Sequence, residues 1–317
     1  MNSPKSLFRL WLDTTRPKTL FAALAPVLMG GALAGSTGPL NVPIWCMTLL
    51  IAVLIQIGTN FCNDVFDHRQ GADTGARQGP LRGLHSGRIS YRSMCVATAG
   101  CFVGVALISA CLISHGGTPV VWLAAASILC GVFYTAGRYS LAYTGLADLF
   151  VLIFFGPVAV AGTYYLQLPQ QGWPPVEVMV AGLGPGLIAT ALLTVNNLRD
   201  VEEDRSNQKR TLAVRFGPAF SRTEYSVCMT GALLTPVLAA GVAGRGWGAL
   251  SVLLLLPAIL PLIRTVHRES TGAGLNPVLG KTGLTLLCFS LLFAATWPLT
   301  WPLPWPLTWA LTWALGG

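Results

Sequence analysis

Long apolar segments alternate with short polar stretches along the whole chain. Each apolar segment contains about twenty residues, which as an α-helix is enough to cross the roughly 30 Å hydrocarbon core of a bilayer. The pattern therefore predicts an all-α, polytopic membrane protein built as a bundle of nine transmembrane helices. We place these helices at residues 19–36, 43–63, 93–114, 118–137, 145–166, 176–198, 223–243, 247–264 and 281–297.

The composition excludes a soluble globule. Of the 317 residues, 53% are hydrophobic and only 10% are charged. Soluble domains carry roughly 25% charged residues, so this chain has too little polar surface to cover a water-exposed fold. The eight cysteines form no CxxC pair and lie mostly within apolar segments, so we interpret them as small buried residues rather than disulfides or zinc ligands.

The basic residues lie almost entirely on one side of the predicted membrane. Nineteen of the twenty Lys and Arg residues fall at the N-terminus or in loops on the same side, and Arg245 falls opposite. Because cytoplasmic loops carry the excess of Lys and Arg, the N-terminus is predicted to be cytoplasmic, and an odd number of spans places the C-terminus outside. The formal charge of +8 then reflects topology. No nucleic-acid-binding motif accompanies it, and no nucleic-acid partner is expected.

Seven of the twelve acidic residues gather in two clusters on the cytoplasmic face. The first cluster follows the second predicted span, where Asn60, Asp64 and Asp67 have i, i+4, i+7 spacing and Asp73 lies a little further on. This spacing places the first three side chains on one face of a continuing helix. Acids at a helix end can also simply solvate the rim of a membrane protein, and one cluster alone does not decide between these interpretations.

A matching second cluster, about 130 residues later, favours a functional site. Asn196, Asp200 and Asp204 follow the sixth predicted span with i, i+4, i+8 spacing, and Glu202 and Glu203 lie between them. Each motif offers one amide and two carboxylates, which are hard oxygen ligands suited to Mg²⁺ rather than zinc or copper. Two such faces across a cavity would repel each other without cations, and Mg²⁺ bound to a diphosphate would remove that cost.

Basic residues beside the two motifs fit the same chemistry. Arg77 and Arg82 follow the first motif, the latter within Gly-Pro-Leu-Arg-Gly at 79–83, and Lys209 follows the second. Such side chains bind diphosphate oxygens and stabilise a departing negative charge. For any single basic residue, positive-inside topology is the better explanation, and we select Arg77, Arg82 and Lys209 because each belongs to a motif segment. For Arg16 and Lys18 topology is the preferred explanation, with contact to an acceptor carboxylate as the alternative.

Two further residues are candidates for the site. Asp148 lies alone at the start of an apolar span, where an ionisable residue is a functional candidate by default, although capping of the helix N-terminus would also explain it. It would act as a base or orient the acceptor. Tyr134 could face the diphosphate or the developing carbocation, although tyrosines are common at the membrane interface. The four histidines have no ligand spacing, and none is expected to be catalytic.

The acidic motifs resemble those of the UbiA superfamily of intramembrane prenyltransferases. Accompanying phrases resemble one branch of it, the 1,4-dihydroxy-2-naphthoate polyprenyltransferases of menaquinone biosynthesis. These phrases are Arg-Pro-Lys-Thr-Leu at 16–20, Tyr-Thr-Ala-Gly at 134–137, Gly-Leu-Ala-Asp at 145–148, Phe-Gly-Pro-Val-Ala-Val-Ala-Gly-Thr-Tyr-Tyr-Leu-Gln at 155–167, and Asn-Gln-Lys-Arg-Thr-Leu-Ala-Val-Arg at 207–215. The resemblance covers about residues 11–290. It departs from the branch at Gln208, where a glycine is often found before the lysine, and in a proline-rich ending.

The resemblance implies a helical bundle around a central cavity that opens laterally to lipid, located in the bacterial cytoplasmic (inner) membrane with a cytoplasmic active site. The implied reaction joins 1,4-dihydroxy-2-naphthoate to a polyprenyl diphosphate and yields demethylmenaquinone, diphosphate and CO₂. By analogy, the Mg²⁺ cofactor would be held by residues of the two motifs. These are Asn60, Asp64, Asp67, Asp73, Asn196, Asp200 and Asp204. The prenyltransferase domain would span residues 1–297.

Residues 298–317 form a Trp/Pro-rich tail in which tryptophan recurs every four residues. Its prolines forbid a regular helix in its first half, and it is expected either to anchor at the lipid interface or to have no dedicated role.

Two alternative functions remain open from the sequence. A prenyltransferase for another aromatic acid, such as 4-hydroxybenzoate, would carry the same metal motifs. A membrane cation transporter would place ionisable residues near the middle of the membrane and often shows repeated halves with broken helices. Here the acidic clusters lie at one face only, beside phosphate-type basic residues, which disfavours transport.

Overall fold

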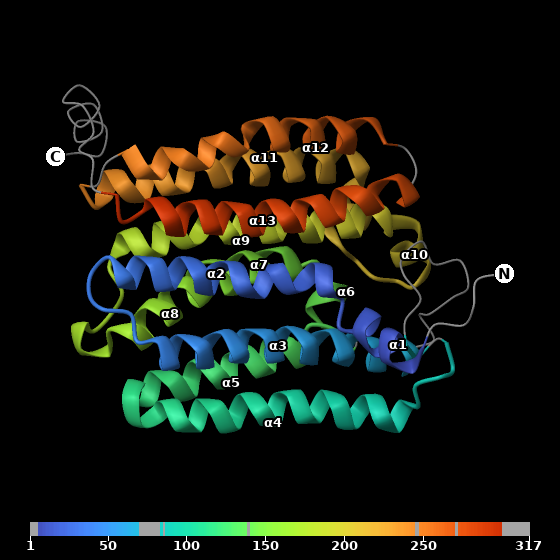
Figure 1. Ribbon diagram of the computed structural model, residues 1–317. Helices are drawn as coiled ribbons and strands as arrows, with labels where there is room; N and C mark the ends of the chain where they lie inside the picture. Colours follow the sequence, from blue (N-terminus) through green and yellow to red (C-terminus); the bar gives the residue numbers. More distant parts are fainter. Residues whose placement is uncertain are drawn as a thin grey trace.

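The computed structural model describes residues 6–69, 83–84, 86–137, 140–244, 247–269 and 272–299. Within these ranges the chain is helical and contains no strand, which confirms the all-α prediction. Asp73, Arg77 and Arg82, together with all but the first two residues of the predicted tail, lie outside the described residues. The helices run roughly parallel to one another and form a bundle (Figure 1).

Every predicted span coincides with a helix. Eight helices in the described part of the chain are long and apolar enough to cross a membrane, and the chain is a multi-pass membrane protein. The ninth predicted span is the apolar helix α5 (Thr118–Phe133), whose 16 residues extend for about 24 Å. The eight long segments are Pro17–Gly35 (α2), Val42–Arg69 (α3), Tyr91–Gly116 (α4), Ala147–Gln167 (α7 to α8), Val176–Arg199 (α9), Leu212–Val242 (α11), Gly248–Arg268 (ending in α12) and Gly272–Thr296 (ending in α13).

Two helices extend further toward the polar end of the bundle than the hydrophobic pattern predicts. Helix α3 continues to Arg69, six residues past the predicted end at 63, so Asp64 and Asp67 remain on a helix. Helix α11 begins at Leu212 rather than 223, where the Thr211 hydroxyl caps it by accepting from the Val214 N–H at 3.3 Å, and a kink at Gly217 (φ 84°, ψ 172°) separates this first part from the rest of the helix. Apolar periodicity ends where the chain leaves the hydrocarbon, although helical structure can continue beyond that point.

The packed core surrounds α9, the most buried of the spans. Helix α9 packs against α11, α13, α2 and the α7–α8 segment. Helix α4 lies at the outer edge of the bundle (Figure 1), and it exposes Val96, Val103 and Leu107. Such apolar side chains would be unfavourable in water but face lipid in a membrane protein.

The fifth predicted span, expected at 145–166, is interrupted. Helix α7 (Ala147–Ile153) passes into a π-helical stretch (Phe154–Val158) before α8 (Ala159–Gln167). The stretch contains Gly156, with non-helical φ −116° and ψ −115°, followed by Pro157. It lies against two glycines of α9. A Cβ atom added at Gly182 would lie 2.8 Å from the Pro157 Cα, so only glycine permits this approach.

Short helices gather at the polar end of the bundle. They are α1 (Leu7–Thr14), α6 (Leu141–Thr144) and α10 (Val201–Ser206), on the right in Figure 1. Helix α1 was not predicted. It buries Leu10 and exposes Leu7, Phe8 and Leu12, a pattern typical of a helix lying in the membrane interface. The remaining 3₁₀ segments are Pro169–Gln171, Trp247–Leu255 and Gly272–Leu275, and α12 and α13 span Leu256–Arg268 and Asn276–Thr296.

Candidate active site

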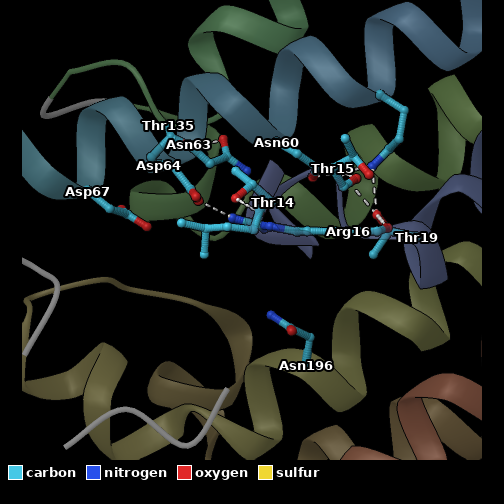
Figure 2. Close-up of polar contacts among 12 residues, drawn as sticks. Thr14, Thr15, Arg16, Thr19, Asn60, Asn63, Asp64, Asp67, Thr135 and Asn196 are labelled. Carbon is cyan, nitrogen blue, oxygen red and sulfur yellow. Dashed lines mark hydrogen bonds and ion pairs between the residues drawn. The ribbon is translucent and has the colours of Figure 1, made fainter. Parts of the chain in front are cut away.

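Both acidic motifs line one cavity at the polar end of the bundle. The cavity has a volume of about 210 Å³. Asn60, Asn63 and Asp67 line it from α3, on one side of the bundle. The second motif lines it from the end of α9 and from α10, with Asn196, Asn197, Asp200 and Asp204. Figure 2 shows Asn196 on α9 opposite the side chains of α3 and the α1–α2 turn. Segments about 130 residues apart therefore form a single polar chamber.

The first motif is held by the turn between α1 and α2. The Arg16 Nη2 atom donates to Asp64 Oδ1 at 2.6 Å, and Arg16 itself lines the cavity (Figure 2). The Asn60 side-chain N–H donates to the Thr15 carbonyl at 3.0 Å and to the Thr19 hydroxyl at 3.2 Å. Asn60, Asp64 and Asp67 are 3%, 0% and 3% exposed, so the motif is desolvated and oriented by its neighbours.

Arg16 adopts an unusual backbone conformation that directs it into the chamber. Its φ of 54° and ψ of 67° lie in the left-handed region, immediately before Pro17 at the start of α2. A following proline disfavours the right-handed helical conformation, so the chain reverses here rather than joining α1 to α2. A non-glycine residue in this region costs about 1–2 kcal/mol. Sequence reasoning assigned Arg16 to topology; the structure places it at the site.

The second motif crosses a helix break without losing its spacing. Helix α9 ends at Arg199 and α10 begins at Val201, with Asp200 between them at φ −98° and ψ 12°. The Asp200 N–H still donates to the Asn196 carbonyl at 3.1 Å, and the Asp204 N–H donates to the Asp200 carbonyl at 2.8 Å. Because these i to i−4 bonds persist across the break, Asn196, Asp200 and Asp204 all line the cavity.

Arg199 is a second residue that sequence reasoning missed. Its Nε and Nη2 donate to the two carboxylate oxygens of Asp200 at 2.7 Å and 2.5 Å, and Nη2 also donates to Asn196 Oδ1 at 2.8 Å. Its Nη1 donates to Asn276 Oδ1 on α13 at 3.1 Å. The sequence signal that pointed to Arg199 was its position directly before Asp200. This signal was overlooked because Arg199 was counted among the basic residues of a cytoplasmic loop.

Lys209 connects the second motif to the first. Its Nζ lies 3.3 Å from Asp67 Oδ1 on α3 and 5.5 Å from the centre of the Tyr143 ring. The turn that positions it closes α10. The Gln208 N–H donates to the Arg205 carbonyl and the Lys209 N–H to the Asp204 carbonyl, the pattern of a Schellman motif. Gln208 has φ 57°, the conformation that glycine adopts most readily, which explains why a glycine suits this position.

Asp204 has a raised pKa. Burial raises the pKa of its carboxyl to about 7, the positive charge of Lys209 lowers it, and the nearby Asp200, Glu203 and Asp67 raise it. Asp204 belongs to the short helix α10, outside the spans. Its charge therefore changes near neutral pH, where the ordinary aspartate is fully ionised.

Deeper in the chamber lie Tyr134 and Asp148. Both line the cavity, together with Val151 and Phe155. Asp148 is 5% exposed, and neither of its carboxylate oxygens has a hydrogen-bond partner among the described residues. A buried carboxylate without a donor is costly unless a ligand supplies one. It was expected either to cap a helix or to serve the site; its position on the cavity wall favours the second.

A second, apolar cavity adjoins the first. It has a volume of about 170 Å³ and runs between α2, α3, α5 and the α7–α8 segment. Five residues line both cavities, namely Gln56, Thr59, Tyr134, Val151 and Phe155. A polar chamber at one end of the bundle thus lies directly beside an apolar cavity, which we call the apolar channel.

The polar chamber has ligands for a hard divalent ion. Its lining offers amide and carboxylate oxygens from both motifs and no histidine or cysteine, a donor set that fits Mg²⁺. No group of three His, Cys, Asp or Glu side chains is close enough to enclose a metal by itself, judged on the residues the structure describes. Ligands from both faces, including the asparagines, would be needed together with substrate oxygens.

Comparison with known proteins identifies the family. The profile of the UbiA prenyltransferase family matches residues 23–279. A 1,4-dihydroxy-2-naphthoate octaprenyltransferase of Escherichia coli is 36% identical over 290 residues, 89% of this chain and 93% of that protein. The protein of the same name from Haemophilus influenzae is 33% identical over 299 residues, 90% and 94% of the two chains.

Solved structures share the fold. An apo UbiA homologue from Aeropyrum pernix K1 has a TM-score of 0.67 at 17% identity, covering 88% of this chain and 96% of that one. A UbiA homologue from Archaeoglobus fulgidus bound to GPP and Mg²⁺ has a TM-score of 0.59 at 16% identity, covering 90% and 98%. The match over most of the chain, together with the two motifs at one chamber, shows that this protein belongs to the UbiA prenyltransferase family.

Proposed function

We propose that this protein transfers a polyprenyl group from polyprenyl diphosphate to 1,4-dihydroxy-2-naphthoate, with loss of diphosphate and CO₂, to give demethylmenaquinol, the reduced form of demethylmenaquinone. The observation that carries the proposal is the adjacency of two cavities that share part of their walls, because an amphipathic prenyl diphosphate needs a polar chamber for its head and an apolar channel for its chain. The naphthoate acceptor is inferred from relatives that bear this name and are 31–36% identical over about nine-tenths of the chain.

The diphosphate head would bind in the polar chamber with Mg²⁺. The ion would be held by Asn60, Asp64 and Asp67 from one side and by Asn196, Asp200 and Asp204 from the other. Mg²⁺ supplies charge neutralisation that makes diphosphate a better leaving group. Lys209, which lies beside Asp67, would contact diphosphate oxygens. Asp73, Arg77 and Arg82 keep their predicted roles as a further acid and two diphosphate ligands.

The aromatic acceptor would bind deeper, between the diphosphate and Asp148. An ionised carboxylate can only accept hydrogen bonds, so Asp148 would orient an acceptor hydroxyl and take up its proton. Tyr134, on the wall of both cavities, would lie beside the reacting allylic carbon. Arg16 lines the same chamber and offers a cation to the acceptor carboxylate. In the reaction the allylic C–O bond breaks, a C–C bond to the ring forms, and the ring carboxylate leaves as CO₂.

The membrane orientation follows from charge. We propose that the polar end of the bundle faces the cytoplasm of a bacterial cell and lies in its cytoplasmic membrane, since the basic loops lie on that side. Demethylmenaquinol would then form with its head near the inner leaflet and its chain already among apolar side chains. A cation transporter is less consistent with this arrangement, because the cavity next to the polar chamber is lined mainly by apolar side chains.

The acceptor is tested with membranes that contain the full-length protein, a polyprenyl diphosphate and Mg²⁺. Equal amounts of 1,4-dihydroxy-2-naphthoate and 4-hydroxybenzoate are supplied separately, and prenylated products are quantified by mass spectrometry. We expect demethylmenaquinol, detected as such or as the quinone formed from it by oxidation in air, from the first acceptor and at most a trace of product from the second. Prenylation of 4-hydroxybenzoate alone would assign the protein to the other class of acceptor.

The metal ligands are tested by Asp64→Ala and Asp200→Ala. Each removes a carboxylate from one motif, and turnover is expected to fall at least about 100-fold because charge stabilisation at the leaving group is lost. Glu202→Ala is the matched control, since Glu202 lies on α10 with a side chain that is 79% exposed. Near-normal rates in either aspartate variant, with membrane insertion intact, would contradict the metal site.

A further inference from the structure

Arg199 occupies the ligand atoms of the second motif with a single guanidinium group. It contacts Asp200 Oδ1, Asp200 Oδ2 and Asn196 Oδ1 at 2.7 Å, 2.5 Å and 2.8 Å. These three oxygens are the atoms that the motif would offer to a divalent ion. The Arg199 side chain is 5% exposed and is anchored to Asn276 on α13, so it is a fixed part of the interior rather than a surface residue.

The same relation recurs at the first motif. Arg16 pairs with Asp64 at 2.6 Å and Lys209 with Asp67 at 3.3 Å. A buried carboxylate without a counter-charge is strongly destabilising, so these cations hold the acidic faces in place. Arg199 differs from the other two because it contacts two ligand residues at once and is the most buried of the three.

We propose that Arg199 is an internal counter-cation that opposes binding of a free divalent ion at Asp200 and favours binding of the ion together with a diphosphate. The proposal rests on the proposed function, because it concerns the metal–diphosphate site. A positive charge in contact with Asp200 repels an incoming dication and attracts the anion that accompanies it. Asn196 and Asp200 line the cavity, and Arg199 acts through them as a positioning residue.

Binding equilibria test this inference without turnover. The full-length protein in detergent is titrated with Mn²⁺, whose free concentration is followed by electron paramagnetic resonance, and then with inorganic pyrophosphate at saturating Mn²⁺. For Arg199→Gln we expect Mn²⁺ alone to bind about tenfold more tightly and pyrophosphate to bind about tenfold more weakly, since one nearby charge is removed.

Two further variants separate charge from contact. Arg199→Lys keeps the charge but loses the fork that reaches Asn196 and both Asp200 oxygens, so Mn²⁺ should bind about threefold more tightly while pyrophosphate affinity stays unchanged. Arg205→Gln is the matched control, because it removes the same charge from an exposed side chain six residues after Arg199, where Arg205 pairs with Glu202 at 3.0 Å. The affinities of this variant for Mn²⁺ and for pyrophosphate should both be unchanged.

The two binding constants must move in opposite directions in Arg199→Gln. If Arg199→Gln binds both Mn²⁺ and pyrophosphate more weakly while its melting temperature is unchanged, Arg199 only maintains the shape of the site. If neither dissociation constant changes, Arg199 does not influence ligand binding. Either result overturns the inference. If Arg199→Gln does not fold, the Arg199→Lys titration decides. If the two affinities of Arg199→Gln change in opposite directions but the unmodified protein prenylates neither acceptor, the proposed function is contradicted and this inference is not.

Discussion

At the scale of single residues, the acidic chamber is organised by cations that come from different parts of the chain. Asp64 forms an ion pair with Arg16, 48 residues earlier in the chain, and Asp67 forms an ion pair with Lys209, 142 residues later. Each pair joins two elements, so folding of the bundle and assembly of the site occur together. Because breaking a buried pair costs about 3–5 kcal/mol, these contacts define the positions of the motifs before any ligand is present.

Asp204 is expected to make the proposed metal binding depend on pH. Burial raises the pKa of its carboxyl to about 7, and a metal ion competes with the proton for the same oxygens. Protonation dominates below this pKa, so we expect Mn²⁺ affinity to fall by up to about tenfold between pH 7 and pH 6 and to level off above pH 8. The measurement is an Mn²⁺ titration at each pH. Asp204→Asn should remove this dependence, and a dependence that persists in the variant would assign it to another group.

The amino-acid types in the motifs allowed candidate ligands to be predicted, but not the residues that pair with them. Asparagine and aspartate at helical spacing after two apolar spans indicate a metal site from sequence alone. Arg16 and Arg199 could not be separated from the other basic residues, because topology alone accounts for arginines near a membrane and the contacts that distinguish them are formed across helices. The left-handed conformation of Gln208 was equally hidden, since glutamine gives no sign of a positive φ.

At the scale of elements, the interruption between α7 and α8 shapes the inner end of the polar chamber. A π-helical stretch shifts the register of the side chains that follow it, and such stretches often occur at functional sites. Here it carries Phe154 and Phe155 on the cavity walls. Hydrophobicity predicted the span correctly, because the break does not change its length or polarity. From the sequence, Gly156 and Pro157 were interpreted as part of a segment that resembles the family, and no helix break was predicted there.

Gly186 is required for this interruption to pack. A Cβ atom there would lie 2.9 Å from the Gly156 Cα and would also meet the Leu152 carbonyl oxygen. Gly186→Ala should therefore lower the free energy of unfolding by about 1–3 kcal/mol, although alanine favours a helix. Thermal unfolding in detergent measures the change. Gly100→Ala on α4, where a Cβ atom meets nothing within 4 Å, should leave the melting temperature unchanged or higher.

At the scale of the whole molecule, polarity changes along the bundle axis. The polar chamber and the short helices lie at one end, and the apolar cavity extends from that chamber toward the other end. The sequence predicted that the motifs would meet, because both follow spans that end on the same side. The apolar channel could not be predicted from the residues, since a side chain that lines a cavity, packs in a core or faces lipid has the same hydrophobic character.

The apolar channel should set the length of the prenyl chain that is accepted. Ala159 lines it at the start of α8, and Ala159→Phe would fill part of a volume of about 170 Å³. In this variant we expect the ratio of the rate with an octaprenyl donor to the rate with a geranyl donor to fall about tenfold or more. The reason is that losing the space for one methylene group of the substrate costs about 1 kcal/mol of binding, and the phenylalanine side chain fills several such spaces. Paired assays of the two donors measure the ratio. Ala99→Phe, at an exposed position on α4, should leave it unchanged.

Helix α5 has a mechanical consequence for the surrounding bilayer. Its 16 residues extend for about 24 Å, several ångströms less than the roughly 30 Å of hydrocarbon in an average membrane. Acyl chains beside α5 must compress to match it, and the apolar channel borders this same helix. The thinnest lipid annulus therefore lies next to the channel wall, and membranes with longer acyl chains should strain this side of the protein first.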